Sequence, residues 1–169
     1  MTDSSVVHAT FHLERLYNAA PARVFAALST EAGKAAWFTG DPGRWELIER
    51  SLDFRVGGRE RLAGRWPSGL VSDFRATYYD IVPNARIVYV YEMFHGERKL
   101  SVSLACWQLD VEGTGTRVRL AEQGAFLDGY DDAGSREHGT NILMDRLGAA
   151  LSGDPLPTLH ALSGEPAGA

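Results

Sequence analysis

The chain has 169 residues, of which 44% are hydrophobic and 23% are charged, and its formal net charge at pH 7 is −5. This length suits one globular domain with a core of its own. The acidic balance argues against general nucleic-acid binding, which needs a basic surface to displace phosphate counterions. No apolar run reaches the roughly 18–20 residues that a membrane helix needs.

The motifs of common catalytic and metal sites do not occur in the sequence. Cys106 is the single cysteine, so neither an internal disulfide nor a paired-cysteine metal site is expected. No phosphate-binding loop, zinc-binding His-Glu-x-x-His or Gly-x-Ser-x-Gly pattern is present. A secretory signal has a basic segment followed by an apolar one, and the first residues of this chain do not show that pattern. We therefore expect a cytoplasmic protein without a metal, a cofactor, a nucleic-acid partner or a membrane partner.

The first elements in chain order are a strand and two short helices. Alternating apolar and polar residues predict a strand over 10–17. Pro21 suits the first turn of a helix, because its missing N–H would be unbonded there. Ser29 and Thr30 offer a cap for a second helix over 31–38.

From Trp45 onward the apolar residues recur with a period of two, which is typical of strands. The pattern predicts six strands, over 45–54, 58–66, 71–82, 86–94, 99–112 and 115–123. In the fifth of these the apolar residues change face between Leu104 and Trp107. A shift of one residue exchanges the two faces, so either a bulge lies near Ala105 and Cys106 or both faces of the strand are covered there; we expect a bulge or a sharp bend.

A long amphipathic helix is predicted from a cap at Ser135 to about Leu151. The order strand, two helices, six strands and helix predicts an α+β fold, in which one curved antiparallel sheet wraps around the C-terminal helix. The expected domain covers residues 8–151. Residues 1–7 form an N-terminal extension, and the Gly- and Pro-rich residues 152–169 form a flexible tail.

Several short motifs occur in an order that resembles a known superfamily. They are Ala20-Pro21-Ala22-Arg23-Val24-Phe25, Trp37-Phe38, Asp53-Phe54-Arg55-Val56-Gly57-Gly58, Tyr79-Asp80-Ile81-Val82-Pro83, Arg86-Ile87-Val88-Tyr89, Gly115-Thr116 and His138-Gly139. The chain resembles the START-like helix-grip superfamily (SRPBCC). Within it, the chain is similar to stand-alone bacterial members of the family of Aha-type activators of a heat-shock chaperone ATPase. The resemblance implies a cavity between sheet and long helix that takes an apolar molecule.

Eight residues are candidates for the wall of such a cavity, because buried Tyr and Trp combine apolar surface with a polar group that can orient a ligand. They are Trp37, Phe38, Trp45, Arg61, Tyr78, Tyr91, Trp107 and His138. If the strands present the opposite face, Tyr79 and Tyr89 replace Tyr78 and Tyr91. No residue is assigned a catalytic role.

Five arginines fall close together, and they indicate either an anion site or surface ion pairs with neighbouring acidic residues. They are Arg50, Arg55, Arg59, Arg61 and Arg65.

Three functions are compatible with these features. The first is a carrier or sensor that binds a small apolar molecule without catalysis. The second is a cyclase/aromatase-like or hydrolase-like enzyme, which needs inward polar groups such as His138 with Glu92 or Arg61; Glu122 is a second carboxylate in an apolar strand. The third is a protein-interaction module, either a chaperone regulator or a homodimer.

Overall fold

The computed structural model describes residues 4–159, and its elements follow the expected order. The first half contains β1 (Val6–Tyr17), α1 (Pro21–Ser29), α2 (Glu31–Ala35), β2 (Glu46–Leu52) and β3 (Arg59–Arg65). The second half contains β4 (Val71–Val82), β5 (Arg86–His95), β6 (Arg98–Glu112), β7 (Gly115–Leu127) and α3 (Ala133–Ser152). The α+β prediction is confirmed.

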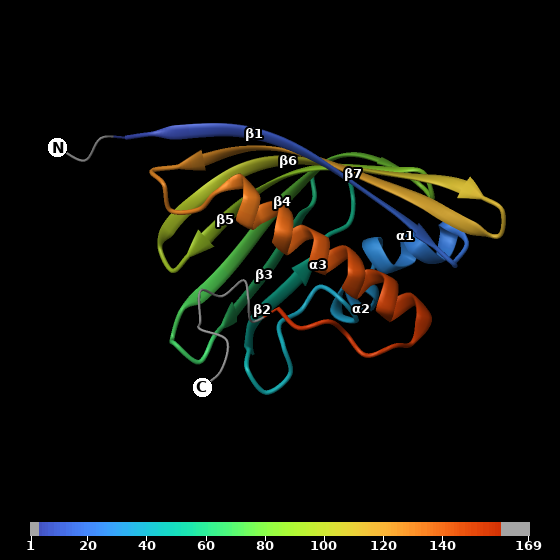
Figure 1. Ribbon diagram of the computed structural model, residues 1–169, viewed down its shortest axis with the longest axis horizontal. Coiled ribbons are helices and arrows are strands. Elements are labelled where there is room, and N and C mark those ends of the chain that lie inside the picture. Colours follow the sequence, from blue (N-terminus) through green and yellow to red (C-terminus); the bar gives the residue numbers. More distant parts are fainter. Residues whose placement is uncertain (1–3, 160–169) are drawn as a thin grey trace.

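The strands form one antiparallel sheet in the order β1-β7-β6-β5-β4-β3-β2. Consecutive strands from β2 to β7 pair as neighbours, and β1 pairs along its whole length with β7, from Val6 opposite Leu127 to Tyr17 opposite Thr116. This full-length pairing explains why β1 begins before the predicted residue 10. The sheet curves, α3 crosses its concave face, and α1 and α2 lie at one end of that face (Figure 1).

The bulge in β6 lies five residues before the predicted position. Phe94 pairs with Lys99 and Met93 with Ser101, so Leu100 is the extra residue on β6. From Ser101 onward the strand alternates regularly, and no register shift occurs at Ala105. The prediction was wrong because it assigned Leu104 to the core face, whereas Leu104 is 38% exposed on the outer face.

Small side chains occupy the inner face of β6 instead. Ser101, Ser103 and Ala105 are all buried there, beside the larger Trp107. A search for large apolar residues therefore selects the wrong face over this part of the strand.

The helices also differ from the prediction at their ends. Asp132, not Ser135, caps α3: its carboxylate accepts the backbone N–H of Ser135 at 2.8 Å. The last helical residue is Ser152, and the C-cap that follows it is Gly153, whose φ of 74° favours glycine. The second short helix stops at Ala35 rather than at residue 38.

The chain beyond α3 is fastened to the domain as far as Leu159. Arg146 is fully buried, and its guanidinium donates hydrogen bonds to the backbone oxygens of Trp37 and Pro157, at 3.0 and 2.6 Å. The same guanidinium pairs with Asp41, whose carboxylate also accepts the N–H of Leu159. The predicted flexible tail over 152–169 stays a prediction, and these contacts show that Pro157 and Leu159 pack against the domain. The predictions for residues 1–3 and 160–169 lie outside the described residues.

The buried Arg146 predicts a large effect of Arg146→Ala on stability. Removal of one partner from a buried ion pair leaves polar groups without compensation and costs about 3–5 kcal/mol. We expect urea denaturation to show a loss of this size. Arg119→Ala is the matched control, because the Arg119–Asp110 pair is about half exposed on both sides. That exposed pair is expected to contribute less than about 1 kcal/mol. Equal losses in the two variants would contradict the assigned role of Arg146.

Candidate functional site: a cavity between the sheet and the long helix

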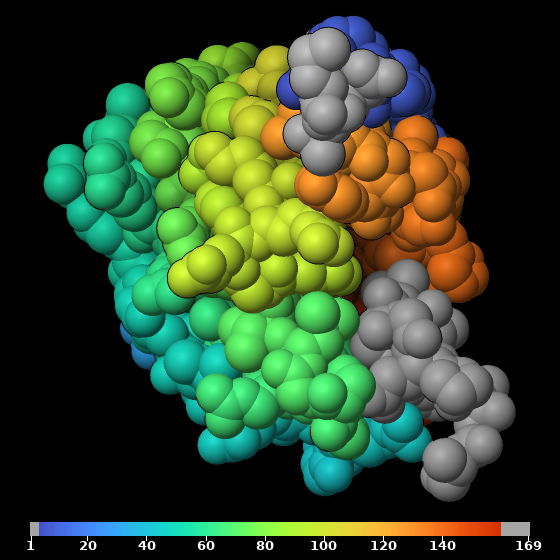
Figure 2. Space-filling view, turned by 90° about the vertical axis from the view of Figure 1, so that its left-hand side faces the viewer, coloured from blue at the N-terminus to red at the C-terminus, as the bar shows by residue number. Residues whose placement is uncertain are grey.

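A cavity of about 670 Å³ lies between the inner face of the sheet and α3. Most of its wall is apolar and aromatic, and α2, the five strands β3 to β7 and α3 all contribute to it. At one end of the cavity, a cation–π contact joins the start of β6 to the segment before α3. The Arg98 guanidinium lies 4.4 Å from the centre of the Tyr130 ring. Figure 2 views the molecule from a side on which these two segments lie next to each other.

The small residues of β6 let long side chains from its two neighbouring strands meet across it. Across β5, β6 and β7, Tyr89 lies opposite Ala105 and Ala105 opposite Glu122. In the next inner row, Ser103 separates Tyr91 from Gly124. The Tyr91 hydroxyl of β5 therefore reaches the Glu122 carboxylate of β7, and both side chains line the cavity.

Aromatic rings form the apolar part of the wall. The Phe74 ring contacts the rings of Phe38 and Tyr91, each with a centroid distance of 5.0 Å. Trp107 lies 6.3 Å from Trp37 and donates its indole N–H to the Tyr89 hydroxyl at 3.1 Å. Such ring contacts stabilise the packing beyond the area they bury.

Trp45 reaches the wall because glycines let its ring lie against the backbone. A Cβ added to Gly64 would lie 1.8 Å from the Trp45 ring, and one added to Gly40 would lie 2.1 Å from it. Neither position tolerates a side chain while Trp45 keeps this placement.

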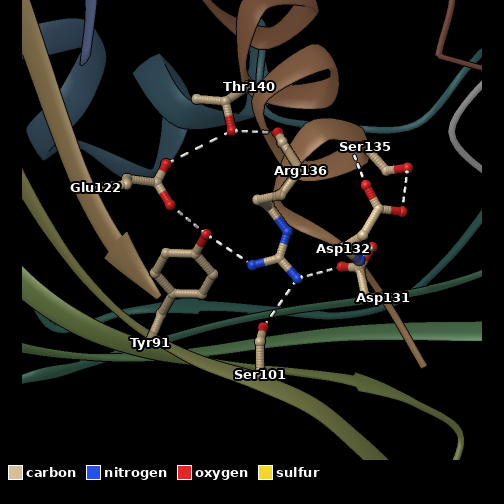
Figure 3. A network of polar contacts seen from close by, with 8 residues as sticks. All are labelled: Tyr91, Ser101, Glu122, Asp131, Asp132, Ser135, Arg136 and Thr140. Carbon is tan, nitrogen blue, oxygen red and sulfur yellow. Dashed lines mark hydrogen bonds and ion pairs between the residues drawn. The ribbon is translucent and has the colours of Figure 1, made fainter. Parts of the chain in front are cut away.

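A network of polar side chains, here called the Glu122 cluster, interrupts the apolar wall between β7 and α3 (Figure 3). It consists of Tyr91, Ser101, Glu122, Asp131, Arg136 and Thr140. The Tyr91 hydroxyl donates to the Glu122 carboxylate and accepts from Arg136 at 3.0 Å. Arg136 also donates to Ser101 at 2.8 Å and pairs with Asp131 at 2.6 Å.

The Glu122 carboxyl is buried, with 5% of its residue surface exposed. Burial raises its pKa above the usual value, although the hydrogen bond from Tyr91 and the charge of Arg136 act in the opposite direction. Burial also raises the pKa of Tyr91, and the nearby Glu122 charge adds to that effect. The phenol is therefore a hydrogen-bond donor at neutral pH.

A second buried ion pair joins Lys34 of α2 to Glu60 of β3, at 3.2 Å. The Tyr78 hydroxyl donates to Glu60 at 2.7 Å. The Lys34 ammonium also lies 4.6 Å from the centre of the Phe38 ring, a favourable cation–π distance, and it lines the cavity. No motif of the sequence marks Lys34, because its partner Glu60 is 26 residues away and meets it only through the fold.

Six of the eight predicted residues line the cavity, namely Trp37, Phe38, Trp45, Tyr91, Trp107 and His138. Arg61 and Tyr78 do not. Arg61 points from the outer face of β3 and pairs with Asp73 at 2.9 Å and with Glu49. Tyr78 points inward but is covered, with 1% exposure, beneath Phe54 and beside Glu60. Their placement in the wall was wrong.

The structure shows which face of β4 and β5 points toward the cavity, a choice that the sequence pattern did not decide. Tyr79 is 60% exposed beside a register shift in β4, whereas Tyr89 and Tyr91 both face inward and line the cavity. Glu92 faces outward and pairs with Lys99. Because Glu92 and Arg61 both lie on the outer face, the catalytic group of His138 with Glu92 or Arg61 is not assembled.

Three of the five arginines near the first hairpin, Arg55, Arg61 and Arg65, form ion pairs with acidic neighbours. Arg55 pairs with Asp53 at 2.9 Å, and Arg65 lies 3.7 Å from Glu46. Arg50 instead donates to the Phe38 backbone oxygen at 2.7 Å.

Sequence reasoning missed Arg136, which holds the Glu122 cluster together. Its position in the first turn of the long helix, close to His138, could have indicated that it reaches the cavity. The predicted cap at Ser135 was incorrect, so the direction of the Arg136 side chain could not be inferred. Within residues 4–159, no group of three or more His, Cys, Asp or Glu side chains is arranged to hold a metal ion. In the same range, no helix is long and apolar enough to cross a membrane.

A curved antiparallel sheet, a long C-terminal helix across its concave face and a cavity between them define a protein of the START-like helix-grip fold. Residues 18–152 match the family model described as activator of Hsp90 ATPase homolog 1-like protein. The chain belongs to this family.

Solved structures of bacterial proteins share the fold. An uncharacterised protein from Rhizobium leguminosarum is 44% identical, with a TM-score of 0.85 over 90% of this chain and 100% of that one. Mll3558 from Rhizobium loti is 42% identical, with a TM-score of 0.80 over 86% and 99%. CV1439 from Chromobacterium violaceum, at 22% identity, has a TM-score of 0.70 over 84% and 96%, which shows the fold alone. No curated protein matches the sequence.

The raised pKa of Glu122 predicts a pH-dependent stability. The folded protein holds this proton more tightly than the unfolded chain, whose carboxyl has the usual value of about 4.5. The free energy of unfolding therefore falls as the pH rises from about 4.5 through the raised pKa. Glu122→Gln removes this contribution. We expect its stability relative to the parent protein to improve with pH, by at most about 1.4 kcal/mol for each pH unit.

Urea denaturation between pH 4 and pH 8 measures this difference. Ile87→Val is the control, because it removes one buried methylene and no titratable group. Its cost of about 0.5–1.5 kcal/mol is expected to stay constant over the same range. A constant difference for Glu122→Gln as well would contradict a raised pKa.

Proposed function

We propose that this protein binds a small, largely apolar molecule in the cavity between the sheet and α3, as a carrier or sensor. The observation that carries the proposal is the cavity itself, about 670 Å³ in volume and lined mainly by apolar and aromatic side chains. Small-molecule sites are clefts of roughly 300–1,000 Å³ with a few placed polar groups. The Glu122 cluster supplies such groups here.

The residues proposed to contact the ligand are Trp37, Phe38, Trp45, Tyr91, Trp107 and His138. Burial of about 200 Å² of apolar ligand surface against such a wall gains on the order of 5 kcal/mol before the entropic cost of binding. His138 is exposed at the surface end of α3, where it can meet a polar part of the ligand.

Ligand binding is favoured over the other two functions for physical reasons. Two of the polar groups expected of an acid–base enzyme, Glu92 and Arg61, lie on the outer face of the sheet, away from the cavity that His138 lines. The other expected carboxylate, Glu122, faces the cavity but is hydrogen-bonded to Tyr91 and Thr140. The family's description names activation of the Hsp90 ATPase, which is a protein–protein activity. A concave, mainly apolar cavity of this volume suits a small molecule better than a flat protein surface.

N-Phenyl-1-naphthylamine, an uncharged fluorescent apolar molecule, tests the proposal. We expect a saturable rise in its fluorescence and thermal stabilisation that grows with its concentration. At a free concentration of 100 times Kd the stabilisation is about 2.7 kcal/mol. For a chain of 169 residues this corresponds to a rise in Tm of about 5–10 °C.

A matched pair of tryptophan variants locates the binding. Leu143→Trp fills the cavity from α3 and is expected to weaken binding at least tenfold. Leu104→Trp adds the same ring to the exposed outer face of β6 and is expected to leave binding unchanged. Binding that survives Leu143→Trp, or that Leu104→Trp abolishes, would place the ligand elsewhere and refute the proposal.

A further inference from the structure

We propose that the ligand of this cavity carries a hydroxyl group, alcoholic or phenolic, that donates its hydrogen to Glu122 and accepts the hydrogen of Tyr89. This inference rests on the proposed function and specifies the chemical class of the ligand. It depends on where the two side chains lie and on how their hydrogen bonds are already used.

Tyr89 and Glu122 line the cavity from the two strands on either side of β6. They belong to a single cross-strand row, with Ala105 of β6 between them. Neighbouring strands are about 4.8 Å apart, so the two backbones are separated by about 10 Å. Ala105 is fully buried and contributes only a methyl group, so it places no bulky side chain between the two.

Glu122 has one carboxylate oxygen whose hydrogen bond is long. Its Oε1 accepts the hydroxyl hydrogen of Tyr91. Its Oε2 accepts from the Thr140 hydroxyl at 3.5 Å. Thr140 has a single hydroxyl hydrogen and shares it with the backbone oxygen of Arg136, which is closer, at 2.9 Å. A carboxylate oxygen can accept more than one hydrogen bond, so Oε2 keeps acceptor capacity for a ligand.

The Tyr89 hydroxyl has a hydrogen without an acceptor among the described residues. Its oxygen accepts the indole N–H of Trp107 at 3.1 Å, but within residues 4–159 its own hydrogen has no acceptor. The residue is 8% exposed, so solvent does not fully compensate it. Tyr89 therefore presents a donor to the same space in which Glu122 presents an acceptor.

One hydroxyl group satisfies both, because its oxygen donates one hydrogen bond and accepts others. A carboxylate offers only acceptors and would be repelled by Glu122 and Asp131. Arg136 does not offset this repulsion, since its guanidinium is already bonded to Tyr91, Ser101 and Asp131. An ammonium group would suit Glu122 but leave the Tyr89 hydrogen without an acceptor. An ether could accept from Tyr89 but would place a second acceptor beside Oε2.

Four naphthalenes with the same ring system separate these cases: naphthalene, 2-naphthol, 2-methoxynaphthalene and 2-naphthoate. Isothermal titration calorimetry at pH 7 measures each Kd. Each hydrogen bond contributes about 0.5–1.5 kcal/mol, so with two of them we expect 2-naphthol to bind roughly 5–100 times more tightly than naphthalene. We expect 2-methoxynaphthalene and 2-naphthoate to bind at least tenfold more weakly than 2-naphthol.

Variants of the two side chains test the assignment. Glu122→Gln keeps an acceptor for Tyr91 but presents an amide N–H₂ to the ligand. We expect the preference for 2-naphthol over 2-methoxynaphthalene to fall at least tenfold. Tyr89→Phe removes one donor and is expected to weaken 2-naphthol several-fold while the naphthalene affinity is unchanged. Glu92→Gln and Tyr79→Phe make the same chemical changes on the outer face and should alter neither.

The naphthalene affinity of each variant reports whether its cavity is intact. If Glu122→Gln does not fold, the comparison of the four probes in the parent protein decides. Equal affinities for naphthalene and 2-naphthol, or a 2-naphthol preference that survives both substitutions, would overturn the hydroxyl assignment and leave apolar binding in place. If none of the four probes binds, the hydroxyl assignment is also overturned. In that case the N-phenyl-1-naphthylamine titration with Leu143→Trp decides whether the proposed function fails too.

Discussion

Small side chains on the inner face of β6 are the constraint on which the polar wall of the cavity depends. Ser101, Ser103 and Ala105 are all buried there. Because they are short, the Tyr91 hydroxyl of β5 reaches across β6 to the Glu122 carboxylate of β7. The Arg136 guanidinium of α3 bonds to Ser101 of the same row. Helix and sheet are therefore joined at the side of the cavity that Tyr91, Glu122 and Arg136 line.

The polar groups around the cavity follow a second constraint, since a buried charge requires compensation. Glu60 has Lys34 and the Tyr78 hydroxyl, and Arg136 has Asp131 and the Tyr91 hydroxyl. Each cluster joins a helix to the sheet, because its members come from both layers. Replacement of such a pair by apolar residues is often neutral for stability. Their retention beside an open cavity is consistent with a role in orienting a ligand.

Much of the fold could be predicted from the sequence, because the strands have a clear period of two and the turns contain Gly and Pro. The order of elements and six of the eight wall residues followed from that pattern. The errors arose where the inward residues are small or polar. Leu104 resembled a core residue, so the bulge at Leu100 was misplaced. Arg61 faces outward because Asp73, on the neighbouring strand, provides its partner, and strand register was not available from the sequence.

The contacts of Arg146 have a mechanical consequence. Its guanidinium holds the backbone of Trp37, in the cavity wall, and that of Pro157, in the segment after α3. Leu159, two residues further on, also lines the cavity. The end of the described chain and the wall are therefore coupled through one side chain. A force or a binding event at the C-terminal segment would be transmitted to Trp37. Conversely, a ligand that displaced Trp37 would weaken the contacts that hold this segment to the domain.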